Sequence, residues 1–213
     1  SNVDVSAPST TYTFDYIPSN TEYSFTISSI TDDGLVGGSA SLSGVMTGPS
    51  AVTDLASTSG TSTSLSLEWS GSEGANLYSV TNGSDTQTTT SNNITFTGLT
   101  ANTYYDIIVT SYNDTIKGGL SILDNLITAP LAPSDPYVSG LTGSGLTLTW
   151  SGASGATKYQ IIADDSQNQT VYETNDTFYN FTGLQPATTY DFTITSYNGD
   201  NLVGESVTLE NVF

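Results

Sequence analysis

One segment of this sequence occurs three times. The stretch GLTANTYYDIIVTSYN at 98–113 returns as GLQPATTYDFTITSYN at 183–198, and a looser copy, YIPSNTEYSFTISSIT, lies at 16–31. Tyr23, Tyr105 and Tyr190 coincide in these copies, 82 and 85 residues apart, and Trp69 and Trp150 are 81 residues apart. A period of this length is too long for a solenoid repeat and fits an independent small domain.

The period divides the chain into three segments. We predict an N-terminal half-module at 1–48, a middle module at 49–130 and a C-terminal module at 131–213. Within each copy, apolar and polar residues alternate, as in Tyr190, Phe192 and Ile194 against intervening Asp and Thr. This period of two predicts strands with one buried face. Breaks such as TDDG, TNGSD and YNGDN indicate hairpin turns, and no segment has a sustained helical period. The predicted fold class is all-β.

The middle and C-terminal modules resemble fibronectin type III modules. Each begins with a Pro-bearing strand (GPSAVTDLAS, APSDPYVSG), followed by a Trp and, nine residues later, a Tyr. Leu99 and Leu184 each precede a Tyr by six residues, as at the tyrosine corner of that family. The resemblance implies tandem immunoglobulin-like β-sandwiches, the N-terminal one incomplete. It also assigns structural roles to the following residues: Trp69, Trp150, Tyr23, Tyr105, Tyr190, Leu99 and Leu184.

The composition excludes several kinds of chemistry. The chain has no Cys and no His, so it lacks disulfides, thiolate nucleophiles and the commonest general base. Lys117 and Lys158 are the only cations against 21 acids, for a net charge of −19, which opposes nucleic-acid binding. No stretch of about 20 apolar residues predicts a membrane span. We predict no catalytic residue, no cofactor, no metal site and no membrane insertion.

The acidic residues leave one alternative open. Asp32–Asp33, Asp164–Asp165, Asp114 and Asp200 fall in or near predicted turns, where Asp bonds to its local backbone. Calcium bridging between modules is the alternative, although no Asp-x-Asp-x-Asp-Gly loop supports it.

Six Asn residues begin N-x-Ser/Thr acceptor motifs for glycosylation. They lie on predicted E strands or in turns, where a glycan could point into solvent. The six acceptors are Asn82, Asn93, Asn113, Asn168, Asn175 and Asn180.

The N-terminal half-module matches only the second half of a sandwich. We predict TYTFDYI as strand E, TEYSFTISSI as strand F and SASLSGVMT as strand G. Strands A, B and C are missing, so the apolar face would be open, a state that invites association. Upstream sequence or strand donation by a second copy, through SNVDVSAPS or a strand exchanged from a module, would cover it.

These features predict a non-catalytic structural subunit of an extracellular, cell-surface appendage or filament. It would be N-glycosylated and assembled by β-strand complementation, and the resemblance implies an adhesive role. Its partners would be other copies of itself or adjacent domains of the same protein. The alternative is a set of accessory spacer modules of a larger secreted hydrolase or of a receptor ectodomain.

Overall fold

Strands make up all the regular elements in the computed structural model, which describes residues 3–6 and 8–213. The N-terminal half-module contains β1 (Glu22–Ile30) and β2 (Val36–Met46). The strands of the middle module are β3 (Thr53–Gly60), β4 (Ser64–Ser70), β5 (Leu77–Thr81), β6 (Thr86–Thr89), β7 (Asn93–Thr97), β8 (Tyr104–Asn113) and β9 (Ile116–Ile127). Those of the C-terminal module are β10 (Ser134–Ser139), β11 (Gly145–Ser151), β12 (Lys158–Asp164), β13 (Gln169–Thr174), β14 (Phe178–Thr182), β15 (Tyr190–Tyr197) and β16 (Val203–Val212).

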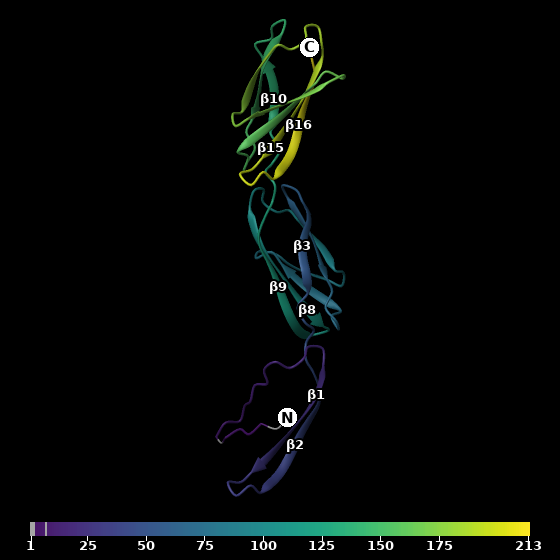
Figure 1. Ribbon diagram of the computed structural model, residues 1–213, viewed down its shortest axis with the longest axis vertical. Coiled ribbons are helices and arrows are strands. Elements are labelled where there is room, and N and C mark those ends of the chain that lie inside the picture. Colours follow the sequence, from purple (N-terminus) through teal and green to yellow (C-terminus); the bar gives the residue numbers. More distant parts are fainter. Residues whose placement is uncertain (1–2, 7) are drawn as a thin grey trace.

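Each of the two larger modules is a sandwich of two antiparallel sheets. In the middle module the sheets have the orders β3-β4-β7 and β6-β5-β8-β9, and in the C-terminal module β10-β11-β14 and β13-β12-β15-β16. These orders correspond to strands A-B-E and C′-C-F-G of the predicted fold. The predicted all-β class with tandem fibronectin type III-like sandwiches is therefore confirmed. The three units lie end to end, with the C-terminus at the far end of the row (Figure 1).

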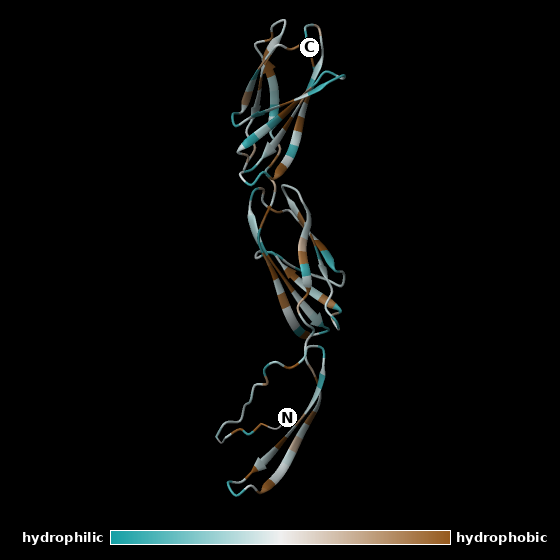
Figure 2. Cartoon of the chain, in the orientation of Figure 1, coloured by the Kyte–Doolittle hydropathy of each residue, from teal (hydrophilic) through white to brown (hydrophobic). Residues whose placement is uncertain are grey.

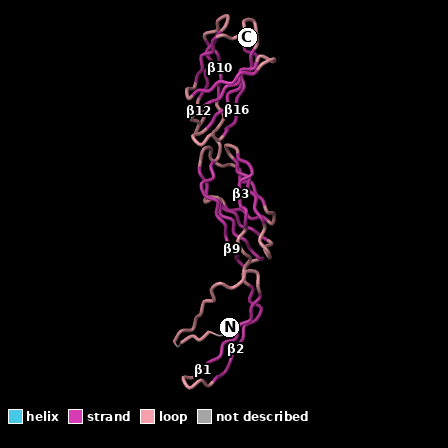
Figure 3. The backbone as a smooth tube through the Cα atoms, in the orientation of Figure 1, coloured by secondary structure: helices cyan, strands magenta, loops and turns pink. Residues whose placement is uncertain are grey.

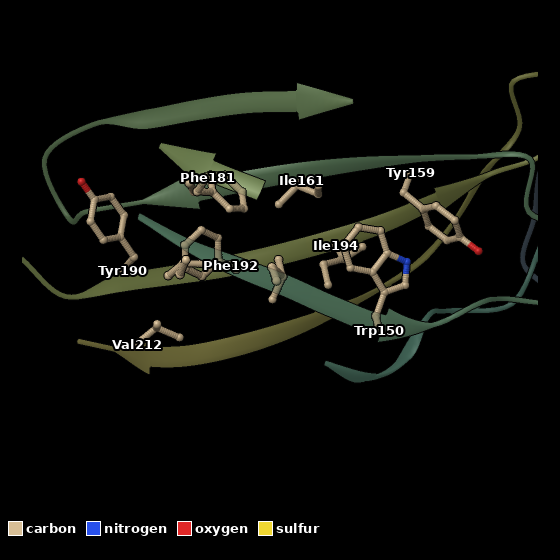
Figure 4. Close-up of a cluster of buried hydrophobic side chains, with 11 residues drawn as sticks. Trp150, Tyr159, Ile161, Phe181, Tyr190, Phe192, Ile194 and Val212 are labelled. Carbon is tan, nitrogen blue, oxygen red and sulfur yellow. The ribbon is translucent and has the colours of Figure 1, made fainter. Parts of the chain in front are cut away.

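The inward-facing residues of the two sheets fill the core of each sandwich. In the C-terminal module, Leu148, Ile161, Phe192 and Ile194 are fully buried. Trp150 lies at one end of this core with its ring edge against Tyr159, 5.3 Å between centroids (Figure 4). The middle module repeats the pair with Trp69 and Tyr78 at 5.4 Å. Both Trp residues are thus buried packing residues of strand B, the place that the resemblance implies.

The tyrosine corners have the expected geometry in two copies. The amide of Thr100 donates a hydrogen bond to Tyr105 Oη (2.9 Å), and the amide of Gln185 donates to Tyr190 Oη (3.0 Å). Leu99 and Leu184 are half-buried beside these tyrosines. In the N-terminal copy the donor position is Pro18, which has no amide hydrogen, so Tyr23 cannot make this bond.

The N-terminal half-module differs from the prediction. Its described residues before β1 form no strand, so the predicted E strand at TYTFDYI is absent (Figure 3). In the other modules the E strand has one hydrogen-bonded neighbour, strand B: β7 pairs with β4, and β14 with β11. With no strand B beside it, the segment has no ladder to join. β2 also begins at Val36, three residues before the predicted SASLSGVMT.

Candidate functional site

The acidic residues singled out as turn or calcium candidates lie in separate surface turns, except Asp164, which is the last residue of β12. Asp165 Oδ1 accepts hydrogen bonds from the amides of Gln167 and Asn168, and these bonds lower the pKa of its carboxyl group. Asp114 Oδ1 accepts from Asn76, and Asp200 Oδ2 accepts from Tyr104. Within residues 3–6 and 8–213, no three acidic side chains come close enough to hold a metal ion.

A shallow depression on the middle module is the other place where carboxylates gather. Asp54 and Glu68 line it together with Trp69 and Asn92. Hydrogen bonds from Ser70 and Thr53 lower the pKa of the Asp54 carboxyl group. The equivalent of Glu68 in the C-terminal module is Thr149, so the pair is not repeated. The depression is lined by two carboxyl side chains and by no cationic side chain.

Five of the six predicted glycan acceptors are at least partly accessible. Asn93, Asn168, Asn175 and Asn180 are exposed, and Asn113 is half-buried. Asn82 is only 5% exposed, contrary to the expectation that it faces solvent. Its Oδ1 accepts hydrogen bonds from the amides of Ser84 (3.0 Å) and Asp85 (2.7 Å) and from the Ser84 hydroxyl (3.1 Å). These bonds fold the side chain onto its own turn, an arrangement typical of Asn in turns.

The two junctions between modules are built from equivalent residues. At the first, Thr47 Oγ1 donates to Pro18 O (2.8 Å) and accepts from the Thr21 amide (2.9 Å). At the second, Thr128 Oγ1 donates to Thr100 O (2.7 Å) and accepts from the Thr103 amide (3.0 Å). The same threonine therefore fixes the end of strand G to the turn that precedes strand F in both places.

The short linkers are held on both sides. On the upstream side, the amides of Asn20 and Asn102 donate to the first linker carbonyls, Gly48 O (2.9 Å) and Ala129 O (3.1 Å). On the downstream side, Ser111 Oγ donates to Ser50 O, and Ser196 Oγ donates to Leu131 O, both at 2.6 Å. The linkers thus have little freedom to rotate.

Each junction also brings an Asn against a Gly of the next module. Asn20 and Asn102 adopt the left-handed conformation, with φ of 47° and 48°. They lie over Gly74 and Gly155, where a Cβ atom would collide with the Asn side chain. Both glycines also have positive φ, 79° and 82°, a conformation that residues with a Cβ atom rarely adopt. Each position therefore favours glycine for two reasons, the backbone conformation and the lack of space for a Cβ atom. The second junction adds hydrogen bonds from Ser62 to Glu205, Tyr104 to Asp200 and Asn198 to Asn102.

These junction residues were not predicted from the sequence, although a signal was present. Asn20 and Asn102 occupy the same place in the first two copies of the repeated segment, where the last copy has Ala187. Gly74 and Gly155 likewise coincide in SEGAN and ASGAT. A residue shared by the copies that precede another module, and absent from the last, marks a contact with that module.

The open face of the N-terminal half-module is the remaining surface. β1 and β2 face only the irregular segment that carries the N-terminus (Figure 1), and apolar residues recur along both strands (Figure 2). Ile27 is 76% exposed, whereas the equivalent Ile194 in β15 is fully buried. Leu42 in β2 is 62% exposed. A sheet face that is core elsewhere in the chain is therefore open to solvent here.

No described residues form a helix of the length and hydrophobicity that crossing a membrane requires.

Two bacterial enzymes are similar to this chain in sequence. Endoglucanase B of Cellulomonas fimi is 30% identical over 164 residues, which cover 65% of this chain and 16% of that protein. Chitinase A1 of Niallia circulans is 30% identical over 167 residues, which cover 70% of this chain and 23% of that protein. The chain thus spans less than a quarter of the length of either relative.

Two solved structures and one family model also match this chain. A two-domain fibronectin type III segment of chicken tenascin matches with a TM-score of 0.46 and 20% identity, over 77% of this chain and 99% of that one. The FN1–FN3 domains of chicken CNTN1 match with a TM-score of 0.38 and 17% identity, over 92% of this chain and 77% of that one. The sequence model of the fibronectin type III domain matches residues 50–122 and 131–212. This chain belongs to the fibronectin type III domain family.

Proposed function

We propose that this chain is a non-catalytic spacer that sets the distance and orientation between other parts of a larger extracellular protein. The observation that carries the proposal is the pair of equivalent junctions. Both linkers are hydrogen-bonded on each side, and both place an Asn over a Gly of the next module. Modules joined by free linkers reorient readily, whereas modules joined in this way form a stiff rod.

The relatives support a role as accessory modules of an enzyme. Both are named as enzymes, an endoglucanase and a chitinase, and this chain matches only a minor share of each. A spacer of this kind would hold a catalytic domain at a fixed distance from another domain. The part of the chain that the structure describes holds no group of three potential metal ligands, and the sequence contains no Cys or His.

The spacer proposal is tested by measuring one distance between modules. Since the chain has no Cys, Thr90→Cys and Asn175→Cys provide two exposed, equivalent sites for spin labels. We expect a single narrow distance distribution for the parent and a broader or shifted one for Gly155→Ala, whose new methyl group meets Asn102.

Gly183→Ala is the matched control. Gly183 has a similar φ of 76° in the same module, with nothing near its missing side chain, so it reproduces the backbone strain without the collision. The control should keep the parent distribution. A broad distribution in the parent itself would overturn the spacer proposal.

The second candidate is a subunit of a surface filament, and the open N-terminal face favours it. Such a face would accept a segment from another polypeptide. Electron micrographs of the purified, concentrated chain test this candidate: regular filaments would support it, and a population of single rods would count against it.

A further inference from the structure

The N-terminal half-module carries half of a sandwich core that is already arranged. Four aromatic rings form a ladder there: Tyr12–Phe14 at 4.8 Å, Phe14–Phe25 at 4.9 Å and Phe25–Tyr23 at 6.1 Å between centroids. The C-terminal module contains the same ladder with nearly the same spacings. There, Tyr179–Phe181 is 4.7 Å, Phe181–Phe192 is 4.8 Å and Phe192–Tyr190 is 5.9 Å.

The two strands below the ladder also share their pairing register. Tyr23, Phe25 and Ile27 pair with Val45, Leu42 and Ala40, just as Tyr190, Phe192 and Ile194 pair with Val212, Leu209 and Val207. Both pairs have a register shift between the Tyr and the Phe. The half-module therefore presents the surface on which strands A, B and C pack in the C-terminal module.

The C-terminal module shows which residues cover such a ladder. Leu146 and Leu148 of strand B lie opposite Phe181 and Tyr179. Ile161 of strand C lies opposite Ile194, and the small Ala163 lies opposite the large Phe192. The middle module is a poorer match, because it has Ile94 and Ile107 in place of two of the rings and Asn82 in the position of Ala163.

Exchange between copies cannot close every open face. The described residues contain two sets of strands A, B and C, one in each complete module. They contain three F–G strand pairs, and each pair needs such a set to cover its apolar face. Both sets are already built into cores, with Trp69 at 5% and Trp150 at 3% exposure. An assembly of any number of copies that exchanges these sets would still leave one open face for each copy.

We propose that the open face binds a segment, from outside residues 3–213, that folds as strands A, B and C of a fibronectin type III half-module. The segment carries two large aliphatic residues opposite Tyr12 and Phe14 on its strand B. Its strand C carries an aliphatic residue opposite Ile27 and a small residue opposite Phe25. The inference is independent of the spacer proposal, since it concerns a different surface.

The chain itself supplies a matched probe. Alignment on Phe14 and Phe181 places Ser1 at the position of Asn168, so a second copy of residues 131–167 can be fused directly before Ser1 of the full chain. The measurement is amide hydrogen exchange of β1 and β2. We expect exchange in β1 to slow at least about tenfold, because the added strand C pairs with its free edge and the core closes over it.

The middle module supplies the mismatched control. Alignment on Phe14 and Phe96 places Ser1 at the position of Gly83, so the equivalent fusion contains residues 49–82. It carries Asn82 where the ladder needs a small apolar residue, so it should protect β1 less than the matched fusion does. Equal protection by the two fusions would overturn the specificity of the proposal. No protection by the matched fusion would overturn the proposal as a whole.

A disulfide trap gives a second readout if the matched fusion folds poorly. Ile27→Cys combined with Ile161→Cys in the added copy should form a disulfide, since the equivalent Ile194 and Ile161 are register partners. Ile162→Cys, one residue along, points to the other face and should not link. Linking with both cysteines, or with neither, contradicts the proposal. A slowing of amide exchange in β1 of the unfused chain as the chain concentration rises would also contradict the proposal, because a second copy would then occupy the open face.

Discussion

At the scale of single residues, the tyrosine corners act through one hydrogen bond each. Tyr105→Phe and Tyr190→Phe remove the acceptor of the Thr100 and Gln185 amides and should each cost about 0.5–1.5 kcal/mol of unfolding free energy. Tyr190 is the more buried of the two, so its change should cost more. Urea unfolding followed by Trp fluorescence measures both. Tyr23→Phe is the control, because Pro18 cannot donate there; a loss of similar size at Tyr23 would contradict this account.

Glycan occupancy is also decided residue by residue. In a host that N-glycosylates, Asn93 and Asn180 should carry glycans, since both are exposed on E strands. Asn82 should stay bare if the modules fold before modification, because its Oδ1 is held by three hydrogen bonds within its turn. Peptide mass spectrometry of the secreted protein reports each site. A modified Asn82 beside bare Asn93 and Asn180 would reverse the expected order.

At the scale of elements, equivalent strands should differ in how their apolar residues contribute. Ile194→Ala in β15 empties a fully buried site and should lower the local free energy of opening by about 2–5 kcal/mol. Ile27→Ala in β1 changes a residue that is 76% exposed and should stay within about 0.5 kcal/mol. Hydrogen exchange measured in each strand gives both values. A large effect at Ile27 would mean that something covers the open face in solution.

The local sequence pattern predicted those features of the fold that depend on residues close together in the sequence. The alternation in β8 and β15 gave their buried faces, and the spacing from Leu99 to Tyr105 gave the corner, because each depends on neighbours in sequence. Strand E of the N-terminal half-module was predicted wrongly, since a strand needs a partner and that partner is remote. The junction contacts of Asn20 and Asn102 depend on the packing of separate modules, which periodicity does not describe.

At the scale of the whole molecule, the second junction carries a contact that depends on pH. Tyr104 Oη donates a hydrogen bond to Asp200 Oδ2 (3.0 Å), across the boundary between the middle and C-terminal modules. This hydrogen bond, followed by the negative charge of Asp200, raises the pKa of the Tyr104 phenol above its usual value. The first junction has Glu22 in the place of Tyr104, so only the second should respond.

The sign of this effect follows from the raised pKa. The contact contributes fully below the ordinary tyrosine pKa of about 10 and is lost as the pH rises through the higher value of the folded protein. We therefore expect an NMR titration to give Tyr104 a higher pKa in the parent than in Asp200→Asn. The spin-label distance between the modules should broaden over the same alkaline range in the parent. Equal pKa values for Tyr104 in the parent and in Asp200→Asn would show that the modules do not hold this contact in solution.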